Sequence, residues 1–495
     1  MGGCSSEPNA AKARVLHHQR KLHKWAKADE HKRFHDLWSL VCDPATLQGA
    51  WTRVRANEGS RTAGIDHMTR RYVEQRYGVE RFLGELRQEL KERSFRPLPA
   101  RERLIPKKGG KFRRLGISTL RDRVVQMALK LVLEPIFEAD FYASSYGYRP
   151  GRRTQDAIAE IVHFGNVTYE WVIEADIEAC FDEIDHRALM FEVERRIGDR
   201  RVLHLIRAFL KAEVMTEAGR LERRLTGTPQ GGIVSPLLCN VALSVLDRDF
   251  ESRWEKKPYR RQQLVRQGQG IHRLIRYADD LVVMVRGSRA QAEAVKARLP
   301  RLLEPLGLRL SEPKTRLTHI DAGFDFLCFR IQRRPRENRK PCVYTFVSNE
   351  ALTSVKRKTK ALTKMSTVSL SLQQLIQALN PILRGWTAYF RHAAAKRTFS
   401  YVGYFVWWRV MRWLRKKHPK LTWKRMCRRY QLPGPLQENG AMLYNPEAMR
   451  VRRYRFRGVK IPTPWNDVES KATGLRQRSF DETEFLGGLQ ERLVG

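Results

Sequence analysis

The segment IRYADDLVVMV, from Ile275 to Val285, places two adjacent aspartates between two runs of apolar residues. The runs predict a strand, a tight turn and a second strand, with Asp279 and Asp280 at the turn. The simplest interpretation is a hairpin whose Asp-Asp turn faces solvent, and for an isolated pair this would be preferred. Carboxylates that pack closely repel one another and need a cation. The rest of the chain decides between a solvated turn and a cation site.

A second acidic segment supports the cation site. From Glu170 to Asp185 the chain holds seven acidic residues and neither Lys nor Arg. Asp176 follows the apolar, strand-like run EWVIEA, and two adjacent strands would bring it close to Asp279. Hard carboxylate oxygens favour Mg²⁺. Two such ions about 4 Å apart would clamp the attacking and leaving oxygens of an in-line phosphoryl displacement.

Composition favours a polyanionic partner. The 495 residues include 94 Lys+Arg and 53 Asp+Glu, a formal net charge of +41. This length indicates several subdomains, and this charge is typical of nucleic-acid binding. A basic membrane-surface protein is the alternative, but the sequence shows neither an amphipathic anchor nor the ~18 apolar residues of a membrane span. The seven cysteines form no CxxC pair, which argues against a cysteine-ligated zinc site and indicates a reducing compartment.

Two glycine-containing segments accompany the acidic residues. LIPKKGGKFRRLGI predicts a basic hairpin around Gly109-Gly110, whose cations could close over a triphosphate; a solvated hairpin is equally compatible. TGTPQGGIVSP lets backbone approach a ligand closely and offers the amide of Gln230, although an ordinary strand-to-helix turn is the alternative. This loop lacks the Lys-Ser/Thr order of a P-loop.

Hydrophobic periodicity predicts helices over much of residues 1–40 and over 78–94, 121–138, 189–212 and 289–305, and a helix start at Pro236. Residues 256–272 form a polar, basic insertion. From Arg391 to Tyr430 the chain has 13 Lys/Arg, nine aromatic residues and no Asp or Glu, which predicts a separate, mostly helical module. Most of its Trp residues are expected in a core, and its exposed Arg and Lys on an RNA-binding surface.

In this order the motifs resemble those of group II intron-encoded reverse transcriptase/maturases over roughly residues 50–450. The resemblance rests on GSRTAGIDHMT, LIPKKGGKFRRLGISTLRDRVVQMAL, FYASSYGYRPGRRTQDAI, ADIEACFDEIDH, GTPQGGIVSPLLCNVAL, RYADDLVV, LGLRLSEPKT, GFDFLCF and LNPILRGWTAYFRHA. It implies an α+β, right-hand polymerase fold with fingers, a palm built on an antiparallel sheet, and a helical thumb. The implied divisions are an N-terminal helical extension (1–50), fingers (51–165), palm (166–340), thumb or domain X (341–450) and a C-terminal tail (451–495).

The resemblance also implies roles for individual residues. Asp176, Asp279 and Asp280 would be the catalytic carboxylates and, with the carbonyl of Ile177, the ligands of two Mg²⁺ ions, which Mn²⁺ could replace. The incoming dNTP would meet Lys107, Lys111, Arg113, Phe181 as a steric gate against ribose, and Gln230 near the templating pair. Primer and template would meet Gly227, Lys314, Gly323 and Phe324. Intron RNA would meet Arg409, Arg412, Arg415, Lys416 and Lys417.

The implied activities are RNA-directed DNA synthesis and binding of the parent intron RNA to assist splicing and retrohoming. The implied partners are group II intron RNA, an RNA template with a DNA primer, target DNA and dNTPs, in a bacterial cytoplasm or an organelle. The sequence lacks the cysteine pairs of the HNH-type endonuclease domain found in many members, so target cleavage is not expected. Ser118 and Cys180 depart mildly from the family pattern. Two alternatives stay open: a splicing maturase without polymerase activity, and a domesticated relative used in DNA repair or defence.

Overall fold

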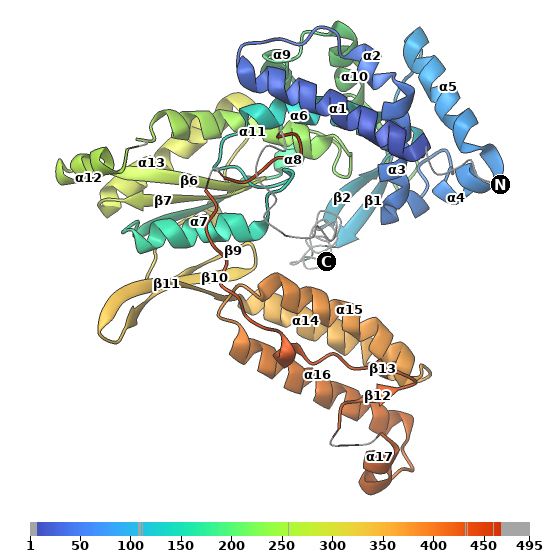
Figure 1. The fold of residues 1–495 in the computed structure, drawn as a ribbon, viewed down its shortest axis with the longest axis vertical. Helices are drawn as coiled ribbons and strands as arrows, with labels where there is room; N and C mark the ends of the chain where they lie inside the picture. Colours follow the sequence, from blue (N-terminus) through green and yellow to red (C-terminus); the bar gives the residue numbers. More distant parts are fainter. Residues whose placement is uncertain are drawn as a thin grey trace. The chain divides into compact units, whose positions relative to one another are not determined.

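The computed structural model describes residues 7–106, 110, 112–255, 257–430, 432, 434–458 and 460–466 (Figure 1). The chain divides into two compact units. The first comprises Met1–Arg153, Ile173–Leu317 and Gly458–Gly495, and the second comprises Thr154–Val172 and Thr318–Arg457. None of the helices in the described part of the chain is both long and apolar enough to cross a membrane. The mixture of helices and mainly antiparallel sheets confirms the predicted α+β class.

Helix α6 (Leu120–Asp140) is the central helix of the first unit, and α1 (Glu7–Ala28) and α3 (Pro44–Ala56) pack against it (Figure 1). Thr119 caps α6 by accepting a hydrogen bond from the amide of Asp122. Nearly every side chain of α6 is buried, which is expected of a helix covered on all sides. Shorter helices precede it: α2 (Trp38–Val41), α4 (Arg70–Tyr72) and α5 (Val79–Glu92).

A proline inside α6 explains how α1 is anchored. Pro135 has no backbone N–H, so the carbonyl of Leu131 loses its intrahelical partner. The side chain of Gln19 on α1 replaces it, donating from Nε2 to the Leu131 carbonyl at 2.8 Å. One turn further along α1, His23 Nδ1 donates to the carbonyl of Pro135 at 3.0 Å. Gln19 also accepts a hydrogen bond from the buried indole of Trp465, at 3.2 Å.

The predicted basic hairpin is confirmed. Strand β1 (Ala100–Pro106) pairs antiparallel with β2 (Phe112–Ile117), from Arg101 opposite Ile117 to Pro106 opposite Phe112. With β4 (Val214–Met215) and β5 (Leu221–Glu222) they form a sheet of order β2-β1-β4-β5. Lys107, Lys108, Gly109 and Lys111 lie outside the described residues.

The second sheet has the order β6-β7-β3-β8, from β6 (Ile271–Tyr277), β7 (Asp280–Arg286), β3 (Trp171–Asp176) and β8 (Arg316–His319). Helices α11 (Ser235–Ser252) and α12 (Pro258–Arg266) pack against β6, and α13 (Arg289–Leu303) packs against α11. Five consecutive residues of β7 are buried, so both faces of the strand are covered. This explains why the sequence there reads as a continuous apolar run instead of alternating. The predicted strand, turn and strand around Asp279 are confirmed.

The helix predicted over residues 189–212 is wrong in one respect, because the structure breaks it. After the short α8 (Cys180–Glu183) come α9 (His186–Glu194) and α10 (Arg200–Leu210), with an irregular segment between them. In this segment Ile197 forms a parallel β-bridge with Phe34. Asp199 accepts hydrogen bonds from the backbone amides of Leu37 and Trp38. A side chain at Gly198 would lie 2.3 Å from the imidazole of His35. The same contacts explain why residues 29–37 are not helical.

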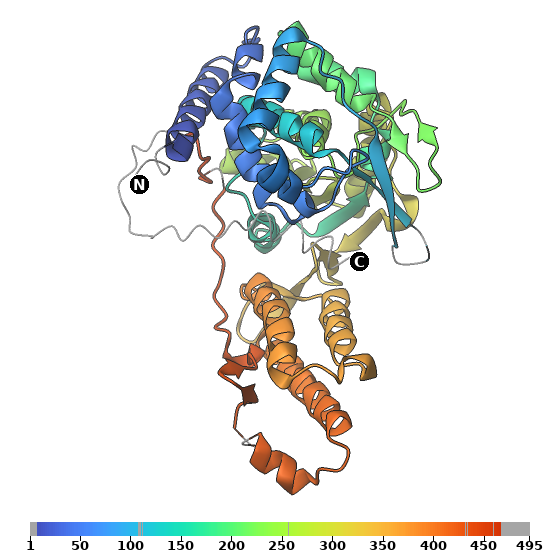
Figure 2. The ribbon, with the colours of Figure 1, turned by 90° about the vertical axis from the view of Figure 1, so that its right-hand side faces the viewer.

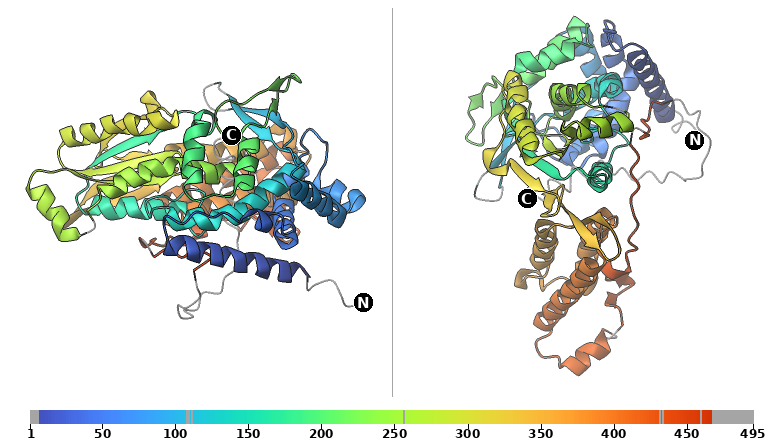
Figure 3. Two further views of the ribbon diagram at one scale, coloured as in Figure 1. Left: turned by 90° about the horizontal axis from the view of Figure 1, so that it is seen from above. Right: turned by 90° about the vertical axis from the view of Figure 1, so that its left-hand side faces the viewer.

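The second unit contains α7 (Thr154–Asn166) and a sheet of order β11-β10-β9, from β9 (Phe324–Phe326), β10 (Phe329–Arg336) and β11 (Arg339–Val347). A bundle of α14 (Asn349–Leu362), α15 (Leu372–Phe390) and α16 (Lys396–Lys417) follows, seen as orange helices in Figures 2 and 3. The unit ends with α17 (Trp423–Arg429), β12 (Gln437–Glu438) and β13 (Ala441–Met442). The mostly helical character predicted for residues 391–430 is confirmed.

Because Gln19 replaces the amide that Pro135 lacks, the effects of substitutions at Gln19 and Pro135 on stability should be coupled. Gln19→Met should lower the free energy of unfolding in urea by about 1–3 kcal/mol, because the Leu131 carbonyl is then buried without a donor. Pro135→Ala restores the intrahelical N–H, so Gln19→Met should be less damaging in that background. The lost contact to Trp465 is common to both backgrounds and cancels. Equal losses in the two backgrounds would contradict the assignment.

Candidate active site

The turn between β6 and β7 is tightly enclosed. Tyr277 and Asp280 are its last paired residues, so Ala278 and Asp279 form a two-residue turn. Ala278 has a φ of 58°, the left-handed value required at the first central position of the hairpin turns that match strand twist. The backbone of Gly147 lies directly against this turn, because a Cβ there would be 2.4 Å from the amide nitrogen of Ala278. A glycine from a distant loop is therefore required to let the turn pack.

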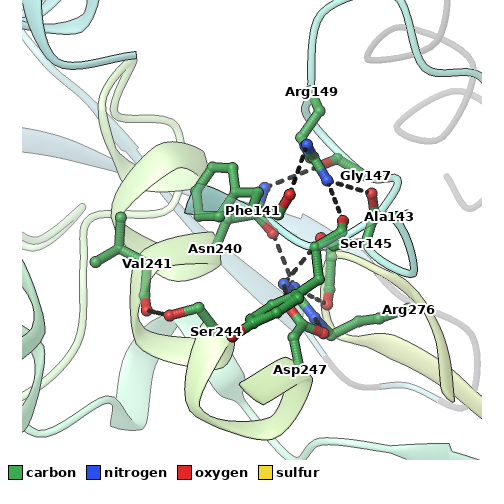
Figure 4. Close-up of polar contacts among 12 residues, drawn as sticks. Phe141, Ala143, Ser145, Gly147, Arg149, Asn240, Val241, Ser244, Asp247 and Arg276 are labelled. Carbon is green, nitrogen blue, oxygen red and sulfur yellow. Dashed lines mark hydrogen bonds and ion pairs between the residues drawn. The ribbon is translucent and has the colours of Figure 1, made fainter. Parts of the chain in front are cut away.

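A fully buried arginine, Arg276, supports the turn through hydrogen bonds (Figure 4). The guanidinium of Arg276 donates five hydrogen bonds: to both carboxylate oxygens of Asp247 (2.9 and 2.5 Å), to Asn240 Oδ1 (2.9 Å), to the Ala278 carbonyl (3.0 Å) and to Ser145 Oγ (2.9 Å). All five N–H groups are thus used. The contact with the Ala278 carbonyl ties the network to the turn itself.

The network extends to the loop that carries Gly147. Asn240 Nδ2 donates to the carbonyl of Gly147 at 2.8 Å, so one side chain joins Arg276 to the loop. A second buried arginine, Arg149, holds the other side of the loop through both oxygens of Glu138 and through the carbonyl of Ser145. Figure 4 labels Arg149 and Ser145. The sequence analysis missed Gly147, Asn240 and Arg276. One feature of the sequence could have revealed Arg276: it is a charged residue within the apolar run that precedes the aspartates.

The three carboxylates predicted from the sequence lie at adjacent strand ends. Asp176 ends β3, and Asp279 and Asp280 lie at the start of β7, its neighbour in the sheet. Burial raises the pKa of Asp280 to about 7, and the charges of Asp279 and Asp176 add to that shift. Burial also raises the pKa of Asp279, with a further contribution from Asp176. The carboxylates are therefore close enough to repel one another in a poorly solvated place, which is the arrangement that a cation would relieve.

Lys314 provides the positive charge that the carboxylates meet within the chain. Its Nζ lies 2.9 Å from Asp176 Oδ2, and this hydrogen bond raises the pKa of the ammonium group. In the described part of the chain no three Asp, Glu, His or Cys side chains form a ready-made metal cluster. The oxygen donors fit Mg²⁺ by their chemistry, but Asp176 would have to exchange Lys314 for the ion.

The backbone at Ile177 favours its predicted role. The carbonyl of Asp176 accepts from the amide of Ser311 (2.8 Å), and the amide of Glu178 donates to the carbonyl of Arg309 (2.9 Å). Ile177 lies between these two hydrogen bonds and opposite Leu310. In this antiparallel pair the two residues form no backbone hydrogen bond with each other. Because peptide groups alternate in direction along a strand, the Ile177 carbonyl points away from Leu310, toward the side where β7 lies.

Arg113 and Phe181 are two of the residues predicted to meet a nucleotide. The positive charge of Arg113 on β2 opposes the rise in the pKa of Asp279. The buried Nε of Arg113 has no hydrogen-bond partner among the described residues. Phe181 lies edge-on to Tyr148, with 6.5 Å between ring centroids. Tyr148 has a φ of 55°, an uncommon value for an aromatic residue, and sequence reasoning missed it. The predicted roles of Lys107 and Lys111 fall on residues outside the described ones.

The GTPQGG loop docks on α8. Gln230 Nε2 donates to Asp182 Oδ2 at 2.5 Å, and the amide of Gly227 donates to the carbonyl of Ile184 at 2.8 Å. Gly227 has a φ of 77°, and a Cβ there would lie 2.4 Å from the carbonyl oxygen of Asp182. The glycine is therefore required by close packing, and Gln230 is oriented by an acidic side chain on the helix that follows Asp176.

The remaining predicted site residues lie in the second unit and differ in accessibility. Gly323 has a φ of 74°, and Phe324 is a core residue of β9. On α16, Arg409 donates to the side chain and carbonyl of Thr363, and Lys417 donates to the carbonyls of Val368 and Leu370. Of the five α16 cations predicted to meet RNA, the other three are exposed and form no hydrogen bond or ion pair with any described residue: Arg412, Arg415 and Lys416. The prediction that most Trp residues of residues 391–430 lie in a core is wrong: Trp413 is buried, but Trp408 and Trp423 are exposed.

The bracing of the turn by Arg276 leads to a stability prediction. Arg276→Met leaves the carboxylate of Asp247 buried and unpaired, so the free energy of unfolding in urea should fall by about 3–5 kcal/mol. Arg276→Met/Asp247→Leu removes both charges and should recover a large part of this loss. A double variant no more stable than the single one would show that the buried pair is not the reason for the loss.

The chain is similar to a known protein family and to several known proteins. Residues 105–404 match the family described as "Reverse transcriptase (RNA-dependent DNA polymerase)". The chain is 38% identical over 355 residues to "Protein YkfC" of Escherichia coli, covering 67% of this chain and 92% of that protein. It is 30% identical over 351 residues to "Group II intron-encoded protein LtrA" of Lactococcus lactis, covering 61% of this chain but only 57% of that protein. A telomerase structure from Candida albicans shows a slight likeness (TM-score 0.37, 14% identity, 67% of this chain and 62% of that chain). The chain belongs to the reverse transcriptase family, and within it to the group II intron-encoded reverse transcriptase/maturases.

Proposed function

We propose that the chain is an RNA-directed DNA polymerase that extends a DNA primer on an RNA template with dNTPs, using Mg²⁺ or, as a substitute, Mn²⁺. The observation that carries this proposal is the convergence of Asp176, Asp279 and Asp280 at two adjacent strand ends, where burial and mutual repulsion raise the pKa of the latter two. A solvated Asp-Asp turn would not produce these shifts, because water would screen the charges.

The carboxylates and the Ile177 carbonyl would hold two metal ions. When bound, Mg²⁺ stabilises negative charge on the oxygens of a phosphoryl transfer. In the proposed reaction the primer 3′-OH attacks the α-phosphate of a dNTP, and pyrophosphate leaves. The contribution of the protein is then mainly positioning and electrostatic stabilisation. Lys314 would be released from Asp176 and become available to the nucleic acid or nucleotide.

The surrounding residues would orient the substrates. The unpaired Nε of Arg113 supports a role in binding the triphosphate, together with Lys107 and Lys111. Phe181, backed by Tyr148, would crowd a ribose 2′-OH and favour dNTPs. Gln230 would lie near the templating pair. Gly227 would act through the shape of its loop, and Gly323 and Phe324 through the backbone of the β9 region, because the Phe324 side chain is buried.

A second activity, binding of group II intron RNA to assist splicing, is proposed for the helical bundle of the second unit. The exposed cations Arg412, Arg415 and Lys416 lie on the same helix as the exposed aromatic residues Tyr404 and Trp408. Cations that meet phosphates and rings that stack on unpaired bases are the usual parts of a single-strand RNA surface. Binding of target DNA and assistance of retrohoming are part of the same proposal.

Primer extension tests the polymerase proposal. On an RNA template with a DNA primer, dNTPs and Mg²⁺, the native chain should extend the primer. Asp279→Asn/Asp280→Asn should reduce the rate by about 1,000-fold or more, roughly 4 kcal/mol of lost transition-state stabilisation. Glu80→Gln/Glu337→Gln removes two exposed acids that have no partner among the described residues, and it should leave the rate unchanged.

A native chain that binds RNA tightly but extends no primer would overturn the polymerase proposal and favour a splicing maturase without polymerase activity. Extension that survives the loss of both aspartates would instead overturn their assignment as metal ligands. A domesticated relative used in repair or defence would extend primers normally and would show no preference for intron RNA over unrelated RNA of equal length.

The different environments of the α16 cations predict different outcomes. Arg412→Ala/Arg415→Ala/Lys416→Ala should weaken intron RNA binding and reduce the slope of log K against log salt by about 2, because each phosphate contact contributes about 0.7 to 0.9. Arg409→Ala/Lys417→Ala should mainly lower thermal stability, because these side chains bond to neighbouring backbone and side-chain groups. Filter binding at several salt concentrations and thermal unfolding distinguish the two. An unchanged slope in the triple variant would exclude this surface.

A further inference from the structure

A cavity of about 360 Å³ lies in the first unit between α2, α3, α5 and the start of α10, and it shares no lining residue with the candidate active site. We call it the α3–α5 pocket; the four helices carry labels in Figure 1. Its charged lining consists of Asp43, Arg87, Lys91, Arg93 and Arg201. Its volume is at the lower end of the range found for small-ligand sites.

The acidic groups at the pocket are already neutralised. Asp43 forms an ion pair with Arg14, at 2.8 Å. Arg201 forms two hydrogen bonds of 3.0 Å with the carboxylate of Asp199 and has a second, exposed acid, Asp36, at 3.5 Å. The other three cations of the lining have no carboxylate partner in the described part of the chain.

The three cations differ in how the protein holds them. Arg87 is held at the wall by a hydrogen bond from its Nε to the carbonyl of Cys42, at 3.2 Å. The exposed side chains of Lys91 and Arg93 form no hydrogen bond or ion pair with any described residue. Burial raises the pKa of the Cys42 thiol to about 11 although Arg87, Lys91 and Arg201 oppose the shift, so the thiol stays neutral and does not compensate them.

Two features of the backbone affect the charge of the pocket. Arg93 follows α5 with a φ of 59°, the left-handed position where helices usually have glycine, so the chain keeps a cationic side chain there against its conformational preference. Helix α3 begins at Pro44, in the wall of the pocket, and the side chain of Asp43 does not cap it. The positive end of a 13-residue helix therefore faces the same cavity. Attraction to the C-terminal end of α5 also favours cations at Lys91 and Arg93.

We propose that the α3–α5 pocket binds a phosphate group of a nucleic-acid strand, as a second anchoring point outside the candidate active site. Three uncompensated cations and a helix N-terminus match a phosphate by charge and by hydrogen-bond donors. The net charge of +41 favours a polyanion over a small free anion as the occupant. Trp38 gives the pocket an apolar wall beside these donors. The proposal does not depend on polymerase activity.

A footprint on lysine tests the pocket locally. Full-length protein is acetylated with an N-hydroxysuccinimide ester, with and without a single-stranded RNA, and the modified lysines are measured by mass spectrometry. RNA should slow the modification of Lys91 about fivefold or more, and Lys296 on α13, which also lacks a partner among the described residues, serves as the reference. Equal protection of both lysines, or of neither, would overturn the proposal.

Matched charge reversals give an independent test. Lys91→Glu/Arg93→Glu should weaken RNA binding about tenfold near physiological salt and reduce the salt slope by about 1.5, as expected for two lost phosphate contacts. Lys296→Glu/Arg301→Glu changes the net charge equally and should stay within about twofold of the native affinity. Equal losses in both variants would mean that total charge, and not the pocket, is responsible.

The source of the phosphate is distinguished by competition. Inorganic phosphate and a nucleoside monophosphate, each at the phosphate concentration of the RNA, should leave Lys91 reactive, because one phosphate lacks the neighbouring contacts of a strand. Protection of Lys91 by the monophosphate as strong as that by RNA would overturn the nucleic-acid assignment in favour of a free nucleotide. These readouts require only binding, so they separate failure of this proposal from failure of polymerase activity.

Discussion

The first unit depends on a buried guanidinium. Arg276 has no exposed surface, so each of its five N–H groups must find an acceptor inside the protein. The acceptors come from α11, from the loop around Ser145 and from the turn that carries the aspartates. One side chain therefore fixes the relative positions of three segments that are distant in sequence. A turn with two carboxylates is held firmly because its carbonyl is one of the required acceptors.

The same burial sets the chemistry of the site. A carboxylate in water near another carboxylate ionises with little penalty, whereas Asp279 and Asp280 lie where burial and Asp176 raise their pKa values. Within the chain only partial relief is available: Lys314 pairs with Asp176, and Arg113 and Arg276 act on Asp279 from a distance. Burial and mutual repulsion thus disfavour ionisation of these carboxylates, and a bound divalent cation would favour it. The hydrogen bond from Arg276 to the Ala278 carbonyl helps to hold the aspartates in this place.

Cations in the two units serve different purposes, which total charge does not reveal. Arg149 and Arg276 are structural and bury their charge in complete hydrogen-bond sets. Arg409 and Lys417 bond to neighbouring groups of the helical bundle, while Arg412 on the same helix is exposed. Exposed cations without partners are the ones that a nucleic acid can reach. Cations such as Arg149 and Arg276, whose charge is buried, are therefore not part of the charge that a nucleic acid can reach.

The sequence by itself determined the local elements and the acidic pair of strand ends. Apolar runs predicted β6, β7 and β3, and the sign reversal around Asp176 predicted that it lies beside Asp279, because strand residues must bury both faces and carboxylates stand out against them. The tertiary structure alone decided the break between α9 and α10, where Phe34 and His35 enter from a distant segment. It also decided that Gly147 must lack a side chain, that Gln19 replaces the amide missing at Pro135, and that Arg409 turns inward. Each of these depends on which distant group approaches a backbone atom, and that information is absent from any local pattern of residues.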